Sequence, residues 1–285
     1  MDRFREATPE DRAAILALRA RCFGDVDPEK QDPRFWDWQF RGARVFVGER
    51  DGAIVTHLAF VRYGNFGLAV DAMSAPEARR SGAYSGLVAF GQDAVRGDFE
   101  LSYAFQIRKP VLGAMLRNGW SIAESIPVLV RPAFLPVRSA PGIELLARAA
   151  AAEMAALART QDFIEWRFFD NPHWTYRVTG ARDEAGRLVA WLVSRPTTLK
   201  GYATQAIVDV AFTDARAARR LIRDAVAEGK HAGCRFIAAF VSRAHPARPL
   251  LSRSLFIPGP HRFRLLVRTP RQEPWRVTWA DTDHL

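Results

Sequence analysis

Ten consecutive residues, Pro76 to Ser85, combine the residue types that hold a diphosphate. They follow an apolar run typical of a strand (Phe66 to Met73) and precede a pattern typical of a helix. Backbone N–H groups at the start of a helix converge on an anion, and the helix dipole favours negative charge there. Gly82 lets the backbone approach a phosphate closely, and Arg79 and Arg80 can add charge-assisted hydrogen bonds. The sequence therefore predicts an anion-binding loop.

The order Arg79-x-x-Gly82-x-Tyr84 resembles the pyrophosphate loop of the GCN5-related N-acetyltransferases. In that family the pattern is Arg/Gln-x-x-Gly-x-Gly/Ala, and the loop binds the pyrophosphate of acetyl-CoA. Tyr84 stands where the second small residue is usual. The alternative is an arginine-rich loop that opens an ordinary helix. The resemblance implies acetyl-CoA as co-substrate and these binding residues: Met73, Ser74, Ala75, Arg79, Arg80, Ser81, Gly82, Ala83, Tyr84 and Ser85.

The elements around this loop follow the same family in order and type over residues 3–132. Phe4 to Asp11 looks like its first strand and turn, and Asp51-Gly52 is typical of a tight hairpin turn. After the loop come a strand pattern (Leu101 to Gln106), a helix pattern (Val111 to Arg117) and the pair Gly119-Trp120. We therefore expect a domain of this fold in the first half of the chain.

The second half repeats the features of the first. Phe163 to Phe168 matches Phe35 to Phe40 in its aromatic residues and its acid-tryptophan pair, and both precede a hairpin. Each half continues with an apolar strand that carries one aspartate, Asp71 or Asp209. The alternative is that the two segments share aromatic residues by chance. The repeat resembles two-domain members of the superfamily. It implies an α/β (α+β) fold of two such domains, residues 1–135 and 136–285, each with a mixed, mostly antiparallel twisted sheet flanked by helices.

The second copy lacks the glycine of the loop. When Asp209 is aligned with Asp71, Arg220 falls opposite Gly82, where a long side chain would fill the space of a phosphate. We therefore predict one acetyl-CoA site, in the N-terminal half, with the C-terminal half shaping the acceptor pocket or the domain interface. The arginines of the second half are interpreted as the solvated face of a helix: Arg216, Arg219, Arg220 and Arg223.

Two further segments of the second half carry structural predictions. The alanine-rich stretch from Glu144 to Ala158 has strong helix propensity and marks the boundary between the halves. The tail from Trp275 to Asp283 is interpreted either as a last strand with acids at its end, Asp281 and Asp283, or as a solvated terminus.

Acyl transfer to an amine needs a polarised thioester, a base and an acid for the leaving thiolate. The resemblance implies that a backbone N–H within Met73 to Ala75 polarises the thioester carbonyl. Asp71 is the candidate base, and a structural aspartate is the alternative. His57 could titrate near neutral pH, although a single histidine among apolar neighbours is usually a packing residue.

The chain differs from the family at the residue that would protonate the leaving thiolate. Met115 occupies the position at which the family often carries a tyrosine, and a thioether cannot donate a proton. Tyr84 and Tyr103 are the available substitutes. Otherwise the thiolate leaves without a positioned acid, or the protein does not catalyse the reaction.

The composition limits the remaining classes. With 48% hydrophobic residues the chain can bury a large core, and the net charge of +10 comes almost wholly from scattered arginines. We therefore expect no nucleic-acid partner. No apolar run approaches a membrane span, no metal-ligand spacing occurs, and two cysteines fit buried free thiols in a reducing compartment. A cytoplasmic monomer or homodimer without membrane or metal is expected.

Three functions remain open from the sequence. The first is an N-acetyltransferase that acts on a primary amine of a small molecule, amino sugar or peptide. The second is an aminoacyl-tRNA-dependent transferase of the same duplicated fold, which the Arg79/Gly82 loop disfavours. The third is a non-catalytic sensor of CoA or a metabolite, which Met115 favours.

Overall fold

The computed structural model describes residues 2–24, 28–106, 109–137, 141–268 and 274–282. The chain forms two compact units. The first unit comprises Met1–Ser125 and Arg264–Arg271, and the second comprises Ile126–Phe263 and Gln272–Leu285. The domain boundary after residue 135 stays a prediction. The two compact units are not a simple division of the chain, because the segment Arg264–Arg271 from the second half belongs to the first unit.

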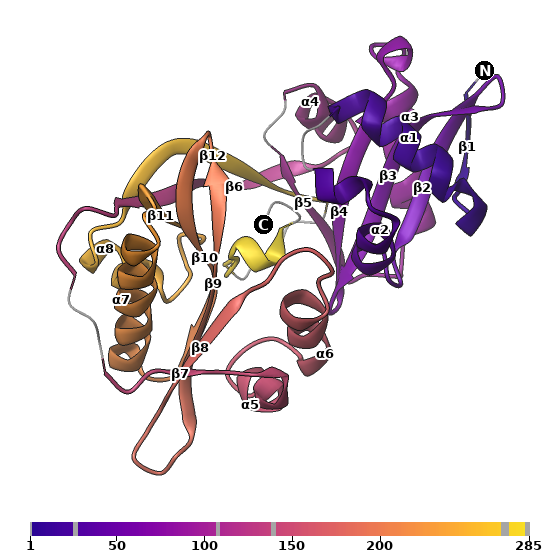
Figure 1. Cartoon of the computed structure of the whole chain (residues 1–285). Helices are drawn as coiled ribbons and strands as arrows, with labels where there is room; N and C mark the ends of the chain where they lie inside the picture. The colour runs from indigo at the N-terminus through magenta and orange to yellow at the C-terminus, as the bar shows by residue number, and fades with distance from the viewer. Residues whose placement is uncertain (1, 25–27, 107–108, 138–140, 269–273, 283–285) are drawn as a thin grey trace. The chain divides into compact units, whose positions relative to one another are not determined.

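The first unit is a sheet with strand order β1-β2-β3-β4-β5-β12, drawn from indigo to magenta in Figure 1 except for its last strand. The first four strands form an antiparallel meander, and β4 and β5 are parallel. The strands are β1 (Arg3–Glu6), β2 (Arg44–Arg50), β3 (Ala53–Tyr63), β4 (Phe66–Ser74) and β5 (Leu101–Gln106). The helices are α1 (Arg12–Phe23), α2 (Pro33–Gln39), α3 (Ala83–Ala94) and α4 (Lys109–Arg117).

The second unit repeats this plan with strand order β12-β6-β11-β10-β9-β8-β7. Strands β7 to β10 are antiparallel, and β10 and β11 are parallel. The strands are β6 (Ser121–Pro132), β7 (Glu144–Leu145), β8 (Arg177–Arg182), β9 (Leu188–Leu199), β10 (Tyr202–Phe212), β11 (Phe236–Phe240) and β12 (Ile257–Val267). The helices are α5 (Ala151–Ala155), α6 (Gln161–Ile164), α7 (Ala215–His231) and α8 (Arg248–Arg253).

Each sheet takes one strand from the other half of the chain. In the first unit, β5 pairs with the end of β12, Arg264–Val267. In the second unit, β11 pairs with β6, which follows α4 in the sequence. Both pairs are antiparallel. The repeat therefore exchanges the strand that follows α4 with the strand that follows α8.

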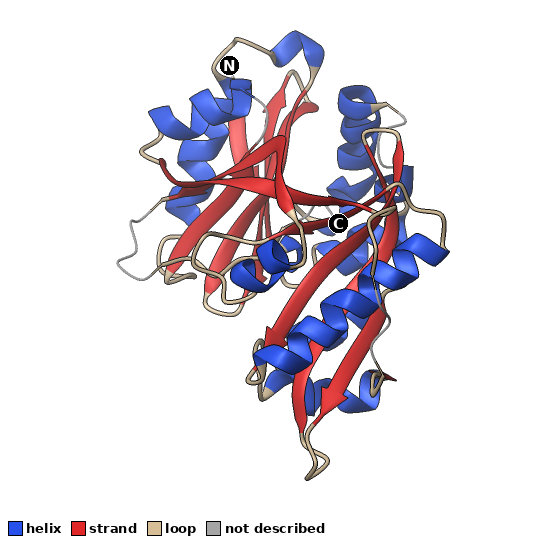
Figure 2. Ribbon diagram, turned by 90° about the vertical axis from the view of Figure 1, so that its left-hand side faces the viewer, coloured by secondary structure: helices blue, strands red, loops and turns tan. Residues whose placement is uncertain are grey.

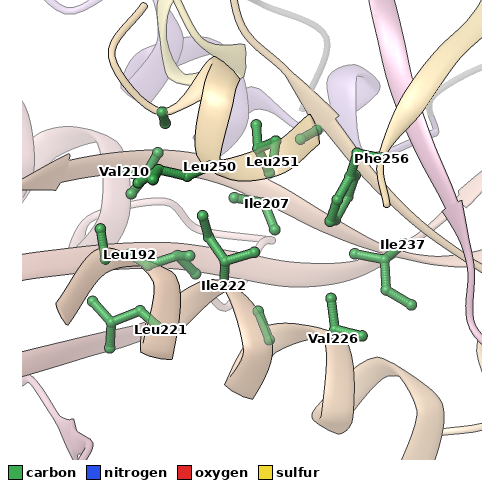
Figure 3. Close-up of a cluster of buried hydrophobic side chains, with 14 of the residues drawn as sticks. Leu192, Ile207, Val210, Leu221, Ile222, Val226, Ile237, Leu250, Leu251 and Phe256 are labelled. Atoms are coloured by element: carbon green, nitrogen blue, oxygen red, sulfur yellow. The ribbon is translucent and has the colours of Figure 1, made fainter. Parts of the chain in front are cut away.

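The hydrophobic cores follow from the periodicity of the strands and helices. In the second unit α7 buries Leu221, Ile222 and Val226, at helical spacing, against β9 to β11 (Figure 3). In the first unit, α3 buries Leu87 and Val88 against alternate residues of β2 to β4. Helices lie against the strands in both units (Figure 2).

Two sequence interpretations need correction. Residues 144–158 do not form one helix: Glu144 and Leu145 make a short strand, Arg148–Ala150 a 3₁₀ turn, and Ala151–Ala155 a five-residue helix. Leu146 donates its N–H to Val178 O at 2.9 Å, so pairing with β8 overrides the helix propensity of the alanines.

The tail is not a strand within its described residues. Thr278 makes an isolated bridge to Val241, and Trp279–Asp281 form a 3₁₀ turn. Nor is this part of the tail a solvated terminus: Asp281 is buried and ion-paired with Arg159. Asp283 lies outside the described residues.

Candidate functional site

The predicted loop opens α3 in the first unit. A 3₁₀ turn (Pro76–Ala78) follows β4, and Gly82 is the N-cap of α3 with a positive φ of 87°. Apart from Gly82 itself, its chain neighbours and the backbone of its own helix, no described atom lies within 4 Å of the position that a Cβ of Gly82 would take. The backbone at Gly82 is therefore left-handed and open, as close approach of a ligand requires.

Side chains hold this loop in place from both sides. The Ser81 hydroxyl donates to Ala78 O at 2.9 Å and accepts from Arg50 Nη2 at 3.0 Å. Ser81 Oγ also accepts the N–H of Ala83 at 3.3 Å. Because the first amides of a helix lack helical partners, the next amides of α3 point out of its N-terminus. They make a donor set for an anion.

The parallel strands β4 and β5 of the first unit separate beside this loop. The parallel ladder between β4 and β5 spans Phe66 to Leu68 on β4 and, among the described residues, goes no further. The N–H of Ala75 donates to Val55 O of β3 at 2.8 Å, so that amide is committed to the sheet. Since N–H directions alternate along a strand, the amide of Ser74 points away from β3, toward the opening. Of the three predicted amides, Ser74 is the one best placed to face a ligand.

A cavity of about 840 Å³ lies where the loop, the end of β4, α1 and α4 meet. Of the predicted acetyl-CoA residues, seven line it: Met73, Ser74, Arg79, Arg80, Gly82, Tyr84 and Ser85. Three are not among the lining residues: Ala75, Ser81 and Ala83. The structure therefore brings most of the predicted set to one place.

The lining also contains residues that the sequence analysis missed. Cys22 and Phe23 come from the end of α1, and Val111, Gly113, Ala114 and Arg117 from α4. The Cys22 thiol donates to Ser74 O at 3.2 Å, and burial raises its pKa. Arg117 ends the helix that follows the loop, and a basic residue at that place is a signal in the sequence for a further phosphate contact.

The cavity is positive and partly apolar. Arg79, Arg80 and Arg117 line it, and no Asp or Glu is among its described lining residues. Arg79 Nε donates to Ser74 O at 3.4 Å, which holds that guanidinium beside the strand end. Phe23, Val111 and other apolar residues complete the wall. This combination suits an amphipathic ligand that carries phosphates.

Asp71, the predicted base, is buried in an ion pair with Arg19 of α1, the two side chains being 6% and 3% exposed. It lies at a β-bulge of β4 with a positive φ of 54°. It is not among the residues that line the cavity. This placement favours a structural role, in which Asp71 fixes α1 and the bulge.

The second unit reproduces this ion pair. Asp209 lies at a bulge of β10 and pairs with Arg159, which also contacts Asp281. Because a buried aspartate–arginine pair occurs at both bulges, a structural role for Asp71 is favoured.

The two tyrosines predicted as acids differ in position. Tyr84 lines the cavity, but its hydroxyl is buried with no hydrogen-bond partner among the described residues, and burial raises its pKa. Tyr103 is buried on β5 beside Tyr63 and Phe105 and does not line the cavity. Met115 is fully buried in the core under α3. Of these three, only Tyr84 reaches the cavity.

His57 is a packing residue. It is fully buried against the rings of Trp36 and Phe40, and its Nδ1 lies 2.8 Å from Asp71 O. Burial and the charge of Arg19 lower its pKa to about 3, so the imidazole is neutral at physiological pH.

The gap that would correspond to the cavity is filled in the second unit. The described tail lies beside β10 and the end of β11: Thr278 Oγ1 donates to Asp209 at 2.9 Å and Ser242 N donates to Val277 O at 3.0 Å. Trp279 is buried and stacks on Phe240. The chain itself occupies this space.

Two negative findings concern the described residues. No helix among them has the length and apolar character to cross a membrane. Within the same described part, no group of three or more His, Cys, Asp or Glu side chains is arranged to hold a metal ion.

No protein-family model and no curated protein matches the sequence. Solved structures of similar fold are found. A GCN5-related N-acetyltransferase from Anabaena variabilis has a TM-score of 0.71 at 12% identity, over 94% of this chain and 72% of that one. Saccharomyces cerevisiae N-myristoyltransferase with bound myristoyl-CoA has a TM-score of 0.64 at 11% identity, over 93% and 78%. A tandem GNAT protein from the clavulanic acid biosynthesis pathway has a TM-score of 0.63 at 14% identity, over 95% and 100%.

Proposed function

We propose that this chain, which has the GCN5-related N-acetyltransferase fold in a two-unit arrangement, transfers an acyl group from acetyl-CoA to a primary amine. The observation that carries the proposal is the cavity of the first unit, where a left-handed glycine, the open N-terminus of α3 and three arginines meet. A fold supports many activities, so the proposed function depends on this site.

Each part of the cavity has a role in the proposed binding. The amides that open α3, with Arg79 and Arg80, bind the pyrophosphate, and Arg117 binds a further phosphate. The amide of Ser74 hydrogen-bonds the thioester carbonyl in the opening between β4 and β5, where it would stabilise the charge that develops on that oxygen. Phe23 and Val111 exclude water from the acyl chain.

In the proposed reaction, the amine nitrogen attacks the thioester carbonyl carbon. The carbon–sulfur bond then breaks, the amide forms, and the CoA thiolate leaves. No carboxylate or imidazole is among the described lining residues, so the proposal takes an amine that enters uncharged. The departing sulfur then accepts the proton that the nitrogen loses. The acceptor is proposed to be a small molecule, an amino sugar or a peptide amine.

A second candidate is a CoA-binding sensor without catalysis. The burial of Met115 in the core favours it, because the family's usual acid position cannot donate a proton here. Release of CoA thiol across a panel of primary amines separates the two. Turnover with any amine supports the transferase, and binding without turnover supports the sensor.

Calorimetric titration with acetyl-CoA tests the site. Gly82→Arg places a long side chain in the open space at the loop and should abolish binding. Gly52→Arg is the matched control, because Gly52 has a φ of 79° and equally open surroundings in the β2–β3 turn. Equal affinity of the Gly82→Arg variant and the wild type would refute the site. Binding of an aminoacyl-tRNA in place of acetyl-CoA would refute the donor.

A further inference from the structure

An arginine stripe runs along the start of α7 in the second unit. Its members Arg216, Arg219, Arg220 and Arg223 recur at helical spacing and, with Asp214, line a cavity of about 530 Å³. At a rise of 1.5 Å per residue, the stripe spans about 10 Å. Four guanidinium groups therefore share one hollow.

The stripe is not neutralised by the described part of the protein. None of its four arginines has an ion pair among the described residues. Other arginines of the same unit do have acidic partners: Arg177 with Asp224, Arg182 with Glu153, and Arg187 with Asp183.

Two local details bear on ligand binding at the stripe. Asp214, the one acid in the cavity lining, accepts the N–H groups of Arg216 and Ala217, at 2.7 and 3.4 Å, as the N-cap of α7. The Nε of Arg223 is buried and has no hydrogen-bond partner among the described residues. A buried donor without a partner is costly, and a bound acceptor would remove that cost.

We propose that the arginine stripe binds a small molecule that carries two or more adjacent phosphates. Guanidinium groups match phosphate oxygens in geometry and charge, and a span of about 10 Å accommodates neighbouring phosphates. Among the described residues that line the cavity, none has an aromatic or aliphatic side chain to hold a base or an acyl chain. The ligand is therefore recognised through its phosphates.

This mode of binding differs from that proposed for the first unit. Asp214 already accepts the N–H groups of Arg216 and Ala217, the second and third residues of α7, so side chains and not these amides make the contacts. The tail fills the space beside β10 and β11, so the second unit offers no channel there for a thioester arm. The stripe and the proposed acetyl-CoA site have no lining residue in common.

Calorimetric titration of the full chain with inorganic tripolyphosphate tests the proposal. We expect saturable binding that Arg220→Gln/Arg223→Gln weakens at least about tenfold, since each lost charge-assisted contact is worth that much or more. Arg216→Gln/Arg219→Gln, at two exposed positions, should weaken binding similarly without touching the core. The control Arg187→Gln/Arg253→Gln removes two exposed charges of the same unit outside the cavity and should leave binding unchanged.

Several results of this experiment would overturn the proposal. Absence of tripolyphosphate binding, or equal weakening in the control and the stripe variants, overturns the proposal. Weakening by Arg79→Gln/Arg80→Gln in place of the stripe variants assigns the ligand to the first unit and also overturns it. Tight binding of a single-stranded RNA oligonucleotide, with no binding of tripolyphosphate, replaces the small molecule with a polynucleotide and refutes the proposal as stated.

Discussion

The buried pair of Asp71 and Arg19 gives the sharpest test of what the bulge aspartate does. Asp71→Asn removes the charge and keeps the shape, and asparagine tolerates the left-handed backbone at this position. The loss measured is then the cost of leaving Arg19 buried without its counter-charge.

The expected cost is large because both side chains are nearly inaccessible to water. Removal of one partner of a buried ion pair destabilises a protein by about 3–5 kcal/mol. The matched control Asp37→Asn breaks an exposed pair with Arg12, the two side chains being 62% and 43% exposed. That change should cost less than about 1 kcal/mol.

Urea denaturation of the wild type and both variants measures these free energies of unfolding. If Asp71 is structural, folded Asp71→Asn protein retains acyl transfer and avoids the roughly 10²–10⁴-fold loss typical of removing a general base. Unchanged stability together with a loss of that size would refute the reasoning and make Asp71 the base.

Two further predictions concern the first unit. His57 has a pKa of about 3 in the folded protein and about 6.5 when unfolded, so the unfolded state takes up a proton first as the pH falls. The free energy of unfolding should therefore fall from about pH 6.5 toward pH 3. Urea unfolding of His57→Gln should show a weaker dependence on pH, and a dependence equal to that of the wild type would contradict the assignment of His57 as a buried, neutral side chain. Arg117→Gln should weaken acetyl-CoA binding about tenfold in calorimetry. The control Arg96→Gln, at an exposed position away from the cavity, should leave the affinity unchanged. Equal affinities of Arg117→Gln and the wild type would show that Arg117 does not belong to the site.

The sequence predicted the elements and their order well because local patterns determine them. Strand β4, the loop with Gly82 and helix α3 form where apolar periodicity and glycine place them. The hairpin at Asp51 and Gly52 also forms, with both residues at positive φ. The predicted fold class, an α/β fold of two units built on mixed, mostly antiparallel sheet and flanked by helices, is confirmed.

The sequence could not predict features that depend on distant partners. The exchange of β6 and β12 depends on which strands pair, and strand patterns do not encode a partner. The burial of Asp281 required knowing that Arg159 lies across from it. Similarly, Asp71 had the residue type of a base, and only the position of Arg19 makes it a partner in an ion pair.

The sequence predicted the loop residues of the candidate site but not the lining residues that come from α1 and α4. Contiguous residues such as Arg79 and Gly82 carry a motif that can be read directly. Cys22 and Arg117 come from helices on either side of the loop in the sequence, and no local pattern joins them to it. Packing of those helices on the sheet brings them to the cavity.

A crystal structure of the full chain soaked with acetyl-CoA tests the central claim most directly. We predict diphosphate density on the amides of Tyr84 and Ser85, with the thioester carbonyl at the N–H of Ser74. Density for the diphosphate at the start of α7, or a loop at Gly82 left empty while the ligand binds elsewhere, would contradict the account.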